Sequence, residues 1–113
     1  MTIDDLIAFG ADTQEGVKRC MNKEDFYLRM VKKVPAEPNF QKLYDSLAAG
    51  DLAAAFDAAH TIKGVAGNLS LTPIFTPASE LTELLRTRTQ ADYAPLVDAI
   101  RKGRDELELL CSK

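Results

Sequence analysis

The chain has 113 residues, of which 46% are hydrophobic and 27% are charged. These proportions fit one globular domain that buries an apolar core without disulfide bonds or metal ions. The formal net charge of −3 argues against a nucleic-acid partner, because nucleic-acid-binding surfaces are usually basic.

Neither a membrane span nor a secretory signal is visible in the sequence. No apolar stretch reaches the roughly 18 residues that a spanning helix needs, and the acidic start "MTIDDLIAFG" lacks a basic leader region. The two cysteines, Cys20 and Cys111, lie far apart and fit reduced thiols better than a disulfide or a zinc site. We therefore expect a cytoplasmic, monomeric protein with a single domain over residues 1–113, no metal ion and no membrane partner.

The chain begins with two short predicted helices. Apolar residues recur three and four positions apart almost throughout, which predicts an all-α protein. Thr2 and Asp5 fit a capping box for a first helix, which Gly10 ends. Asp12 caps a second helix, which reaches about Cys20.

A third predicted helix runs to Pro35. Asn22 is placed to cap it, and Met21 with Phe26 fits a hydrophobic staple around that cap. The helix ends at the proline because the residue before a proline avoids helical geometry. The apolar stripe of this helix consists of Phe26, Met30, Val31 and Val34.

The next two predicted helices meet at a glycine. Pro38 suits the first turn of one helix, and Gly50 ends it in a left-handed conformation. Asp51 then caps a helix that extends to Leu69 or Ser70. The apolar face of the first of these two helices consists of Phe40, Leu43, Tyr44 and Leu47.

Proline complicates the helix that follows. Thr72 and Pro73 look like a cap and a first helical position, and the apolar pattern continues to about Arg86. Pro77 falls one turn inside, where a proline breaks the hydrogen-bond ladder and costs about 3 kcal/mol. Two interpretations stay open: the helix kinks at Pro77, or Thr76 is the true cap and Pro77 lies in the first turn.

A last helix runs from about Asp92 to Leu110. Four long amphipathic segments joined by short turns predict an antiparallel four-helix bundle, with short additional helices at the N-terminus and a bundle core over about residues 38–111. The inward residues of the last helix are Leu96, Ile100, Leu107 and Leu110. The charges assigned to solvated faces include Arg86, Arg88, Arg101 and Arg104.

The helix capped by Asp51 carries the only histidine of the chain, His60, within the stretch "AAHTIKGVAGN". On a helical wheel the centre of the buried stripe lies about 120° from His60, so the imidazole belongs to a flank of the helix. That buried stripe consists of Leu52, Ala55, Ala59, Ile62 and Ala66.

Small residues surround the imidazole along this flank. Within about 40° of it on the wheel lie Gly64, Gly67 and Ala53, and the same strip is bordered by Lys63 and Asp57. Each helix glycine costs about 0.8–1 kcal/mol relative to alanine. Close packing of a neighbouring helix is one reason for such glycines, but these two lie away from the buried stripe. We interpret the strip as a surface that a large partner approaches.

A lone imidazole on such a surface suits phosphoryl transfer better than other chemistry. A metal site needs several ligands, a hydrolytic triad needs a nucleophile with an orienting acid, and acid–base catalysis needs a concave pocket. An imidazole in water is mostly neutral near pH 7, so a ring nitrogen can attack a phosphoryl group carried by another protein. Lys63, three residues after His60, offsets the phosphate charge by only about 1 kcal/mol in water.

The segment "AHTIKG", Ala59 to Gly64, resembles the AH(T/S)(L/I)KG signature of the histidine phosphotransfer (HPt) family of two-component phosphorelays. The resemblance extends to the flanks and covers roughly Ile7 to Leu110. "FGADTQEGVKRCMNKEDFYLRMVKKV" is similar to the entry segment of the family, "LAAGDLAAAFDAAHTIKGVAGNLSL" to the run around its histidine, and "ASELTELLR" to the following helix.

This resemblance implies that His60 is an exposed phosphoacceptor in a four-helix bundle that has no kinase activity of its own. Lys63, Gly64 and Gly67 match the motif positions around that histidine. The expected docking surface for partners consists of Ala53, Asp57, Gly64 and Gly67.

The implied partners are receiver domains of response regulators and a sensor (hybrid) histidine kinase, with magnesium held by the receiver and no cofactor on this chain. The sequence departs from the family pattern at Ser70, where glycine is common, and at Pro73 and Pro77 in the following helix. Two other functions fit the same residues: the phosphoacceptor domain of a chemotaxis-type histidine kinase, and a non-phosphorylated helical adaptor.

Overall fold

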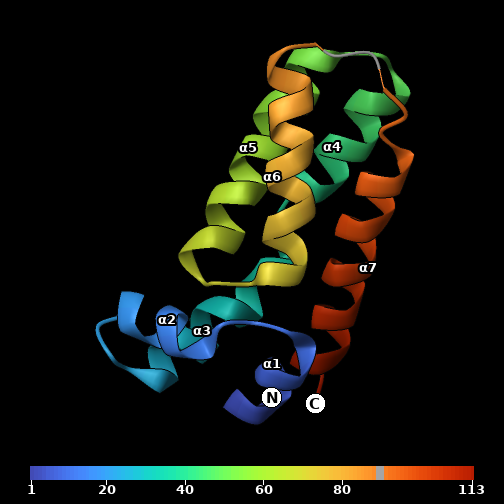
Figure 1. Cartoon of the computed structure of the whole chain (residues 1–113). Coiled ribbons are helices and arrows are strands. Elements are labelled where there is room, and N and C mark those ends of the chain that lie inside the picture. The colour runs from blue at the N-terminus through green and yellow to red at the C-terminus, as the bar shows by residue number, and fades with distance from the viewer. Residues whose placement is uncertain (89–90) are drawn as a thin grey trace.

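The computed structural model describes residues 1–88 and 91–113, which form helices joined by turns and contain no β-strand. Four helices form an antiparallel bundle, in which α5 packs against α4 and α6 while α6 packs against α7 (Figure 1). These helices are α4 (Asn39–Ala48), α5 (Leu52–Asn68), α6 (Thr72–Arg86) and α7 (Ala94–Cys111). The predicted all-α fold, an antiparallel four-helix bundle, is confirmed.

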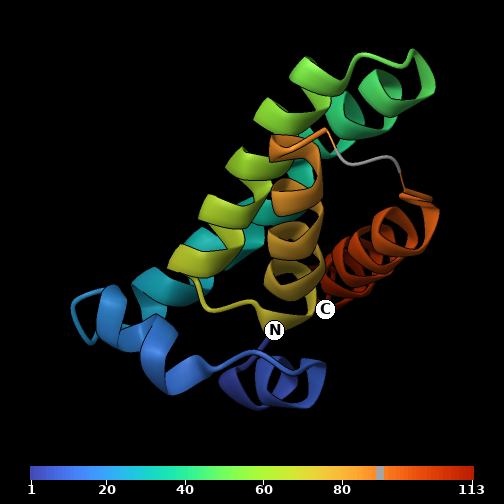
Figure 2. The ribbon, with the colours of Figure 1, turned by 45° about the horizontal axis from the view of Figure 1, so that its top comes forward.

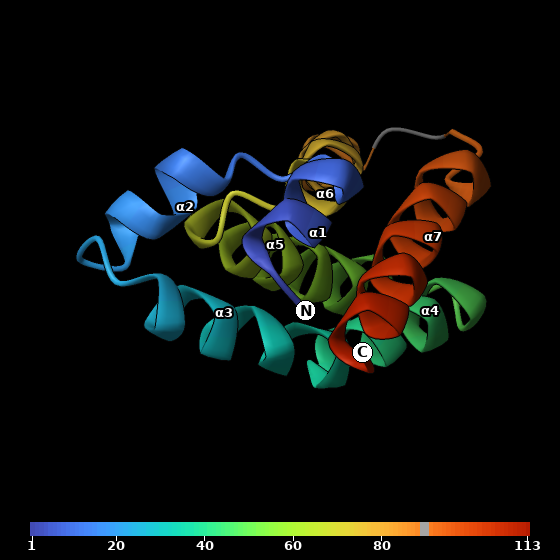
Figure 3. The ribbon, with the colours of Figure 1, turned by 90° about the horizontal axis from the view of Figure 1, so that it is seen from below.

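The N-terminal helices cross one end of this bundle, the end at which α5 turns into α6 (Figure 1, Figure 3). The predicted additional N-terminal helices are thereby confirmed. They are α1 (Ile3–Phe9), α2 (Thr13–Arg19) and α3 (Glu24–Lys33), followed by a 3-10 turn, η1 (Val34–Ala36). None of the helices that the structure describes could cross a membrane.

Local signals in the sequence set several helix ends. Thr2 and Asp5 form a complete capping box at the start of α1, and Gly10 ends that helix with a φ of 111°. Asp12 caps α2 by accepting a hydrogen bond from a backbone N–H one turn on, and Asp51 caps α5 in the same way. These predictions are confirmed, because each depends only on residues within one turn.

The predicted start of α3 is wrong. Lys23 occupies the N-cap position and makes no side-chain cap hydrogen bond. Met21 and Asn22 instead have φ values of 60° and 58°, so the chain reverses through two successive left-handed residues. Asn22 therefore serves as a turn residue, a role that asparagine tolerates. Met21 is 66% exposed, so its side chain does not form the predicted hydrophobic staple with Phe26.

The buried face of α3 also differs from the predicted stripe. Tyr27 and Val31 are buried, whereas Phe26 and Met30 are only half-buried. The Tyr27 hydroxyl donates a hydrogen bond of 2.8 Å to the backbone carbonyl of Leu69, so this buried phenol has a hydrogen-bond partner. Burial raises the pKa of Tyr27 to about 12.

Pro77 lies inside a single helix α6, so Thr76 is not a helix cap. The structure also places Leu71 at the N-cap, with Thr72 and Pro73 as the first two helical residues, so the helix begins one residue earlier than predicted. Pro77 is buried, and its ring lies in the core although the proline cannot donate a backbone hydrogen bond within the helix.

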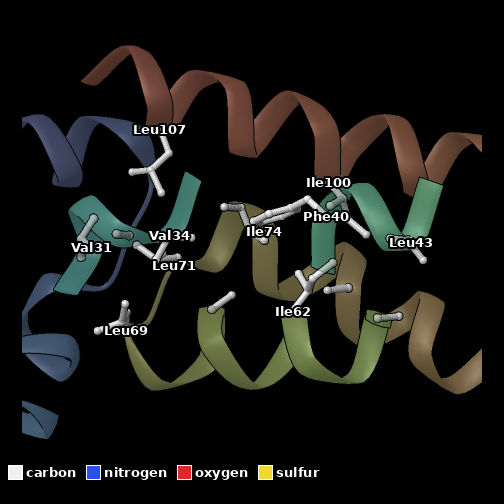
Figure 4. Close-up of a cluster of buried hydrophobic side chains, with 14 of the residues drawn as sticks. Val31, Val34, Phe40, Leu43, Ile62, Leu69, Leu71, Ile74, Ile100 and Leu107 are labelled. Atoms are coloured by element: carbon white, nitrogen blue, oxygen red, sulfur yellow. The ribbon is translucent and has the colours of Figure 1, made fainter. Parts of the chain in front are cut away.

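The core fills the space between the four bundle helices and continues under η1 and the α5–α6 turn (Figure 4). Small side chains of α5 face this core, which lets α4 and α6 approach it closely from either side (Figure 2). The buried residues of α5 are Ala55, Ala58, Ala59, Ile62 and Ala66. In α7, Ile100 and Leu107 are buried as predicted, whereas Leu96 and Leu110 are half-buried.

Candidate functional site

His60 lies on the exposed flank of α5, and its chain neighbour Ala59 is buried. The angular position predicted from the helical wheel is therefore confirmed. The imidazole stacks against the ring of Phe56, one turn earlier, with ring centroids 5.8 Å apart and an interplanar angle of 19°. On that same Phe56 ring lies the guanidinium of Arg86 from α6, 5.2 Å from the centroid. Arg86, which was predicted to lie on a solvated face, thus also packs its guanidinium on the Phe56 ring.

The two glycines beyond His60 face different surroundings. A Cβ atom added at Gly64 would meet nothing within 4 Å, so this glycine leaves open space beside the imidazole. A Cβ atom added at Gly67 would lie 3.0 and 3.1 Å from the ring of Phe75 in α6. The interpretation that both glycines clear space for a partner is wrong for Gly67, which is small because Phe75 packs on it.

A surface hollow of about 380 Å³ opens beside the imidazole. Its α5 wall consists of His60, Lys63, Gly64, Gly67 and Asn68. The flank is therefore hollowed rather than purely convex, because two other parts of the chain lie beside it.

The remaining walls come from segments that are distant in sequence or lie beyond the end of α5. Asp12 and Arg19 enter from the two ends of α2, and Ser70, Thr72 and Phe75 enter from the α5–α6 turn and the start of α6. Ser70 has a φ of 54°, so it occupies the left-handed position that glycine would take more easily. The backbone carbonyl of Ser70 accepts a hydrogen bond of 2.9 Å from the backbone N–H of Asp12, which joins these two walls.

The hollow is positive although the chain is acidic. With His60 neutral, Arg19 and Lys63 supply two positive charges against the one negative charge of Asp12, a net charge of +1. Lys63 is half-buried and has no acidic partner in the described part of the chain. Within that same part, no group of three or more histidine, cysteine, aspartate or glutamate side chains could hold a metal ion.

The structure gathers four of the six predicted site residues at the hollow and leaves two outside it. His60, Lys63, Gly64 and Gly67 line the hollow. Ala53 and Asp57 are exposed on the earlier turns of α5 and line none of it.

A family model of the Hpt domain matches residues 35–110, which include α4, α5, α6, all of α7 except its last residue, and the hollow's α5 and α6 walls. The chain belongs to the Hpt domain family. Hpt domains are phosphocarrier modules of two-component signalling rather than enzymes, and they interact with receiver domains and kinases. A search of curated proteins and a search of solved structures each found no match.

Several residues around the histidine of this Hpt domain are absent from the site predicted from the sequence. The contact of Phe56 with the imidazole could have been found, because residues four apart are neighbours on a helix. No local signal marks Phe75, Asp12 or Arg19, since their positions depend on how α6 and α2 pack.

Proposed function

We propose that this chain carries a phosphoryl group on His60 between the aspartates of receiver domains in a two-component phosphorelay. The observation that carries the proposal is the chain's one imidazole, exposed beside an open glycine position in a domain of the Hpt family. The positive hollow next to that imidazole supports it, because a phosphoryl group arrives with negative charge.

The transfer step needs only an accessible nitrogen lone pair. In this step a ring nitrogen of His60 attacks the phosphorus of an aspartyl phosphate. The nitrogen–phosphorus bond forms while the bond between phosphorus and the aspartate oxygen breaks, and the freed carboxylate stays on the receiver. The reverse reaction passes the group to a second receiver. Catalysis then consists mainly of positioning and charge neutralisation.

Neighbouring residues support this step in different ways. Lys63 supplies a cation without an acidic competitor in the described residues, and Gly64 leaves room for the receiver's active-site loops. Phe56 supports one face of the imidazole and restrains its rotation. Magnesium is supplied by the receiver, and this chain binds no cofactor itself.

Docking of the receiver covers more of α5 than the hollow alone. Ala53 and Asp57 lie exposed on the turns before His60, where a protein surface centred on the imidazole would reach. We include both residues in the docking surface. The proposal includes a cytoplasmic location, since receiver domains and their kinases meet there. It also includes a monomeric state, because one exposed histidine suffices to carry the phosphoryl group.

The test is a transfer assay with a panel of purified receiver domains, each phosphorylated in the presence of magnesium. The wild-type chain should gain acid-labile, alkali-stable phosphate, and His60→Gln should gain none. Lys63→Ala should lower the phosphorylated fraction only modestly, because a cation that water still reaches contributes about 1 kcal/mol or less. Equal losses from the two substitutions would contradict the roles assigned here.

The same assay separates the other candidate functions. Labelling by a histidine kinase with ATP, without labelling by any phosphorylated receiver, would identify the chain as the phosphoacceptor domain of a chemotaxis-type kinase. No labelling of His60 under either condition would leave a helical adaptor as the better description.

A further inference from the structure

The hollow beside His60 extends beyond the part of the chain that matches the Hpt domain. The match begins at residue 35, whereas α2 (Thr13–Arg19) contributes Asp12 and Arg19 to the hollow. In Figure 3, α2 lies across the end of the bundle where α5 meets α6. The N-terminal segment therefore contributes part of the surface that a partner of His60 would meet.

Specific contacts fix α2 in this position. The backbone N–H of Asp12 donates to Ser70, as described above, and the α5–α6 turn also accepts the hydrogen bond of the Tyr27 hydroxyl at Leu69. Gly16, in the middle of α2, packs so closely that an added Cβ atom would lie 2.4 Å from the Tyr27 ring and 2.9 Å from the Leu69 carbonyl oxygen. The base of the Arg19 side chain is therefore held in place relative to α5.

Neighbouring residues use only part of the hydrogen-bonding capacity of the Arg19 guanidinium. Its Nε donates a hydrogen bond of 3.1 Å to Glu15, one turn earlier on α2, and both side chains are about half exposed. Among the described residues Glu15 is its only hydrogen-bond or ion-pair partner. The two terminal nitrogens thus remain able to donate to a planar anion with several oxygens, for which a guanidinium is well suited.

We propose that Arg19 is a second phosphoryl-binding residue, which contacts the phosphoryl group as it enters and leaves His60. Lys63 reaches the hollow from α5 and Arg19 reaches it from α2, so the two cations approach a group on His60 from different walls. The inference rests on the proposed function, which makes His60 the phosphoacceptor. It assigns a role in the transfer to the N-terminal segment, outside residues 35–110.

The experiment uses phosphoramidate as a small phosphodonor, so that no receiver surface contributes. In this reaction the phosphorus–nitrogen bond of phosphoramidate breaks, ammonia leaves, and the bond to the His60 nitrogen forms. We expect Arg19→Gln to slow formation of phospho-His60 by up to about fivefold, the effect of one screened charge–charge contact. Arg19→Lys, which keeps the charge, should retain most of the wild-type rate.

Three further variants serve as controls. Lys18→Gln removes the same charge from the neighbouring position of α2, which does not line the hollow, and should react like the wild type. Glu15→Gln removes the ion pair but leaves the Arg19 cation, so its rate should not fall. His60→Gln should gain no phosphate. Added salt should slow the wild type more than Arg19→Gln, because screening acts only where the charge is present.

The outcomes separate the inference from the function on which it rests. If the wild type is phosphorylated and Arg19→Gln reacts as fast as Lys18→Gln, the inference is wrong while the phosphoacceptor stands. If Glu15→Gln reproduces the loss, Arg19 acts through its ion pair in α2 and the inference is also wrong. If the wild type is not phosphorylated at His60, the proposed function itself fails.

Discussion

Gly16→Ala should destabilise the protein, although the same substitution inside a helix usually stabilises it. The added Cβ atom would lie 2.4 and 2.8 Å from two ring carbons of Tyr27, far closer than two carbon atoms can approach. The ring cannot retreat easily, because Tyr27 is fully buried and its hydroxyl is bonded to the Leu69 carbonyl. The carbonyl oxygen itself would lie 2.9 Å from the new atom.

The size of the effect follows from three opposing contributions. Alanine gains about 1 kcal/mol over glycine from helix propensity. Overpacking typically costs about 1–3 kcal/mol, and breaking the buried hydrogen bond of Tyr27 costs a further 1–3 kcal/mol or so. These contributions sum to about 1–5 kcal/mol, so we expect Gly16→Ala to lower the free energy of unfolding by about 3 kcal/mol.

Gly64→Ala provides the matched control, because it is the same substitution at another helical glycine. Nothing lies within 4 Å of the added Cβ atom at Gly64, so only the propensity gain of about 1 kcal/mol remains. Urea unfolding followed by far-UV circular dichroism measures both variants. With a typical urea dependence, the midpoint of Gly16→Ala should fall by about 1 M or more while that of Gly64→Ala rises. A midpoint for Gly16→Ala at or above that of the wild type would refute the packing described for α2.

Two other predictions concern the open space at Gly64 and the buried hydroxyl of Tyr27. Gly64→Leu should leave the far-UV spectrum helical but slow phosphoryl transfer to His60, because the side chain fills space that a receiver needs; a wild-type transfer rate would contradict the clearance argument for this glycine. The pKa of Tyr27 is raised to about 12 in the folded protein, so its protonated form stabilises the fold below pH 10 and that contribution is lost as the pH rises from 10 to 12. Between pH 9 and pH 11.5 the wild type should lose about 2 kcal/mol more stability than Tyr27→Phe, and equal losses of the two proteins in urea titrations at these two pH values would contradict the assignment.

The sequence predicts helix ends well where a single turn contains the whole signal. Thr2, Gly10 and Asp51 act as predicted, because a cap needs only its own side chain or backbone and a nearby N–H or carbonyl group. The prediction fails at Asn22, which has chemistry suited both to a cap and to a left-handed turn. It also leaves Pro77 undecided, because buried packing around α6 outweighs the local preference against proline.

The candidate site is predictable only along α5. The wheel places His60, Lys63 and Gly64 correctly, since residues of one helix keep fixed angles to each other. Arg19 lies more than 40 positions away in the chain and reaches the hollow only because α2 packs on the α5–α6 turn. A periodicity pattern contains no information about that contact, whereas the close approach at Gly16 shows what holds it.

The two glycines after His60 now have separate explanations, and each shapes the same hollow. Together they forgo roughly 2 kcal/mol of helix propensity, which is a sizeable part of the usual stability of a domain. Gly64 contributes by leaving space empty, whereas Gly67 contributes by letting Phe75 pack against α5. Because Phe75 itself lines the hollow, a side chain at position 67 would displace one of its walls. Access to the imidazole therefore depends on the packing of α6 against α5 as well as on the absence of a side chain at Gly64. The helical wheel could reveal only the absence of that side chain.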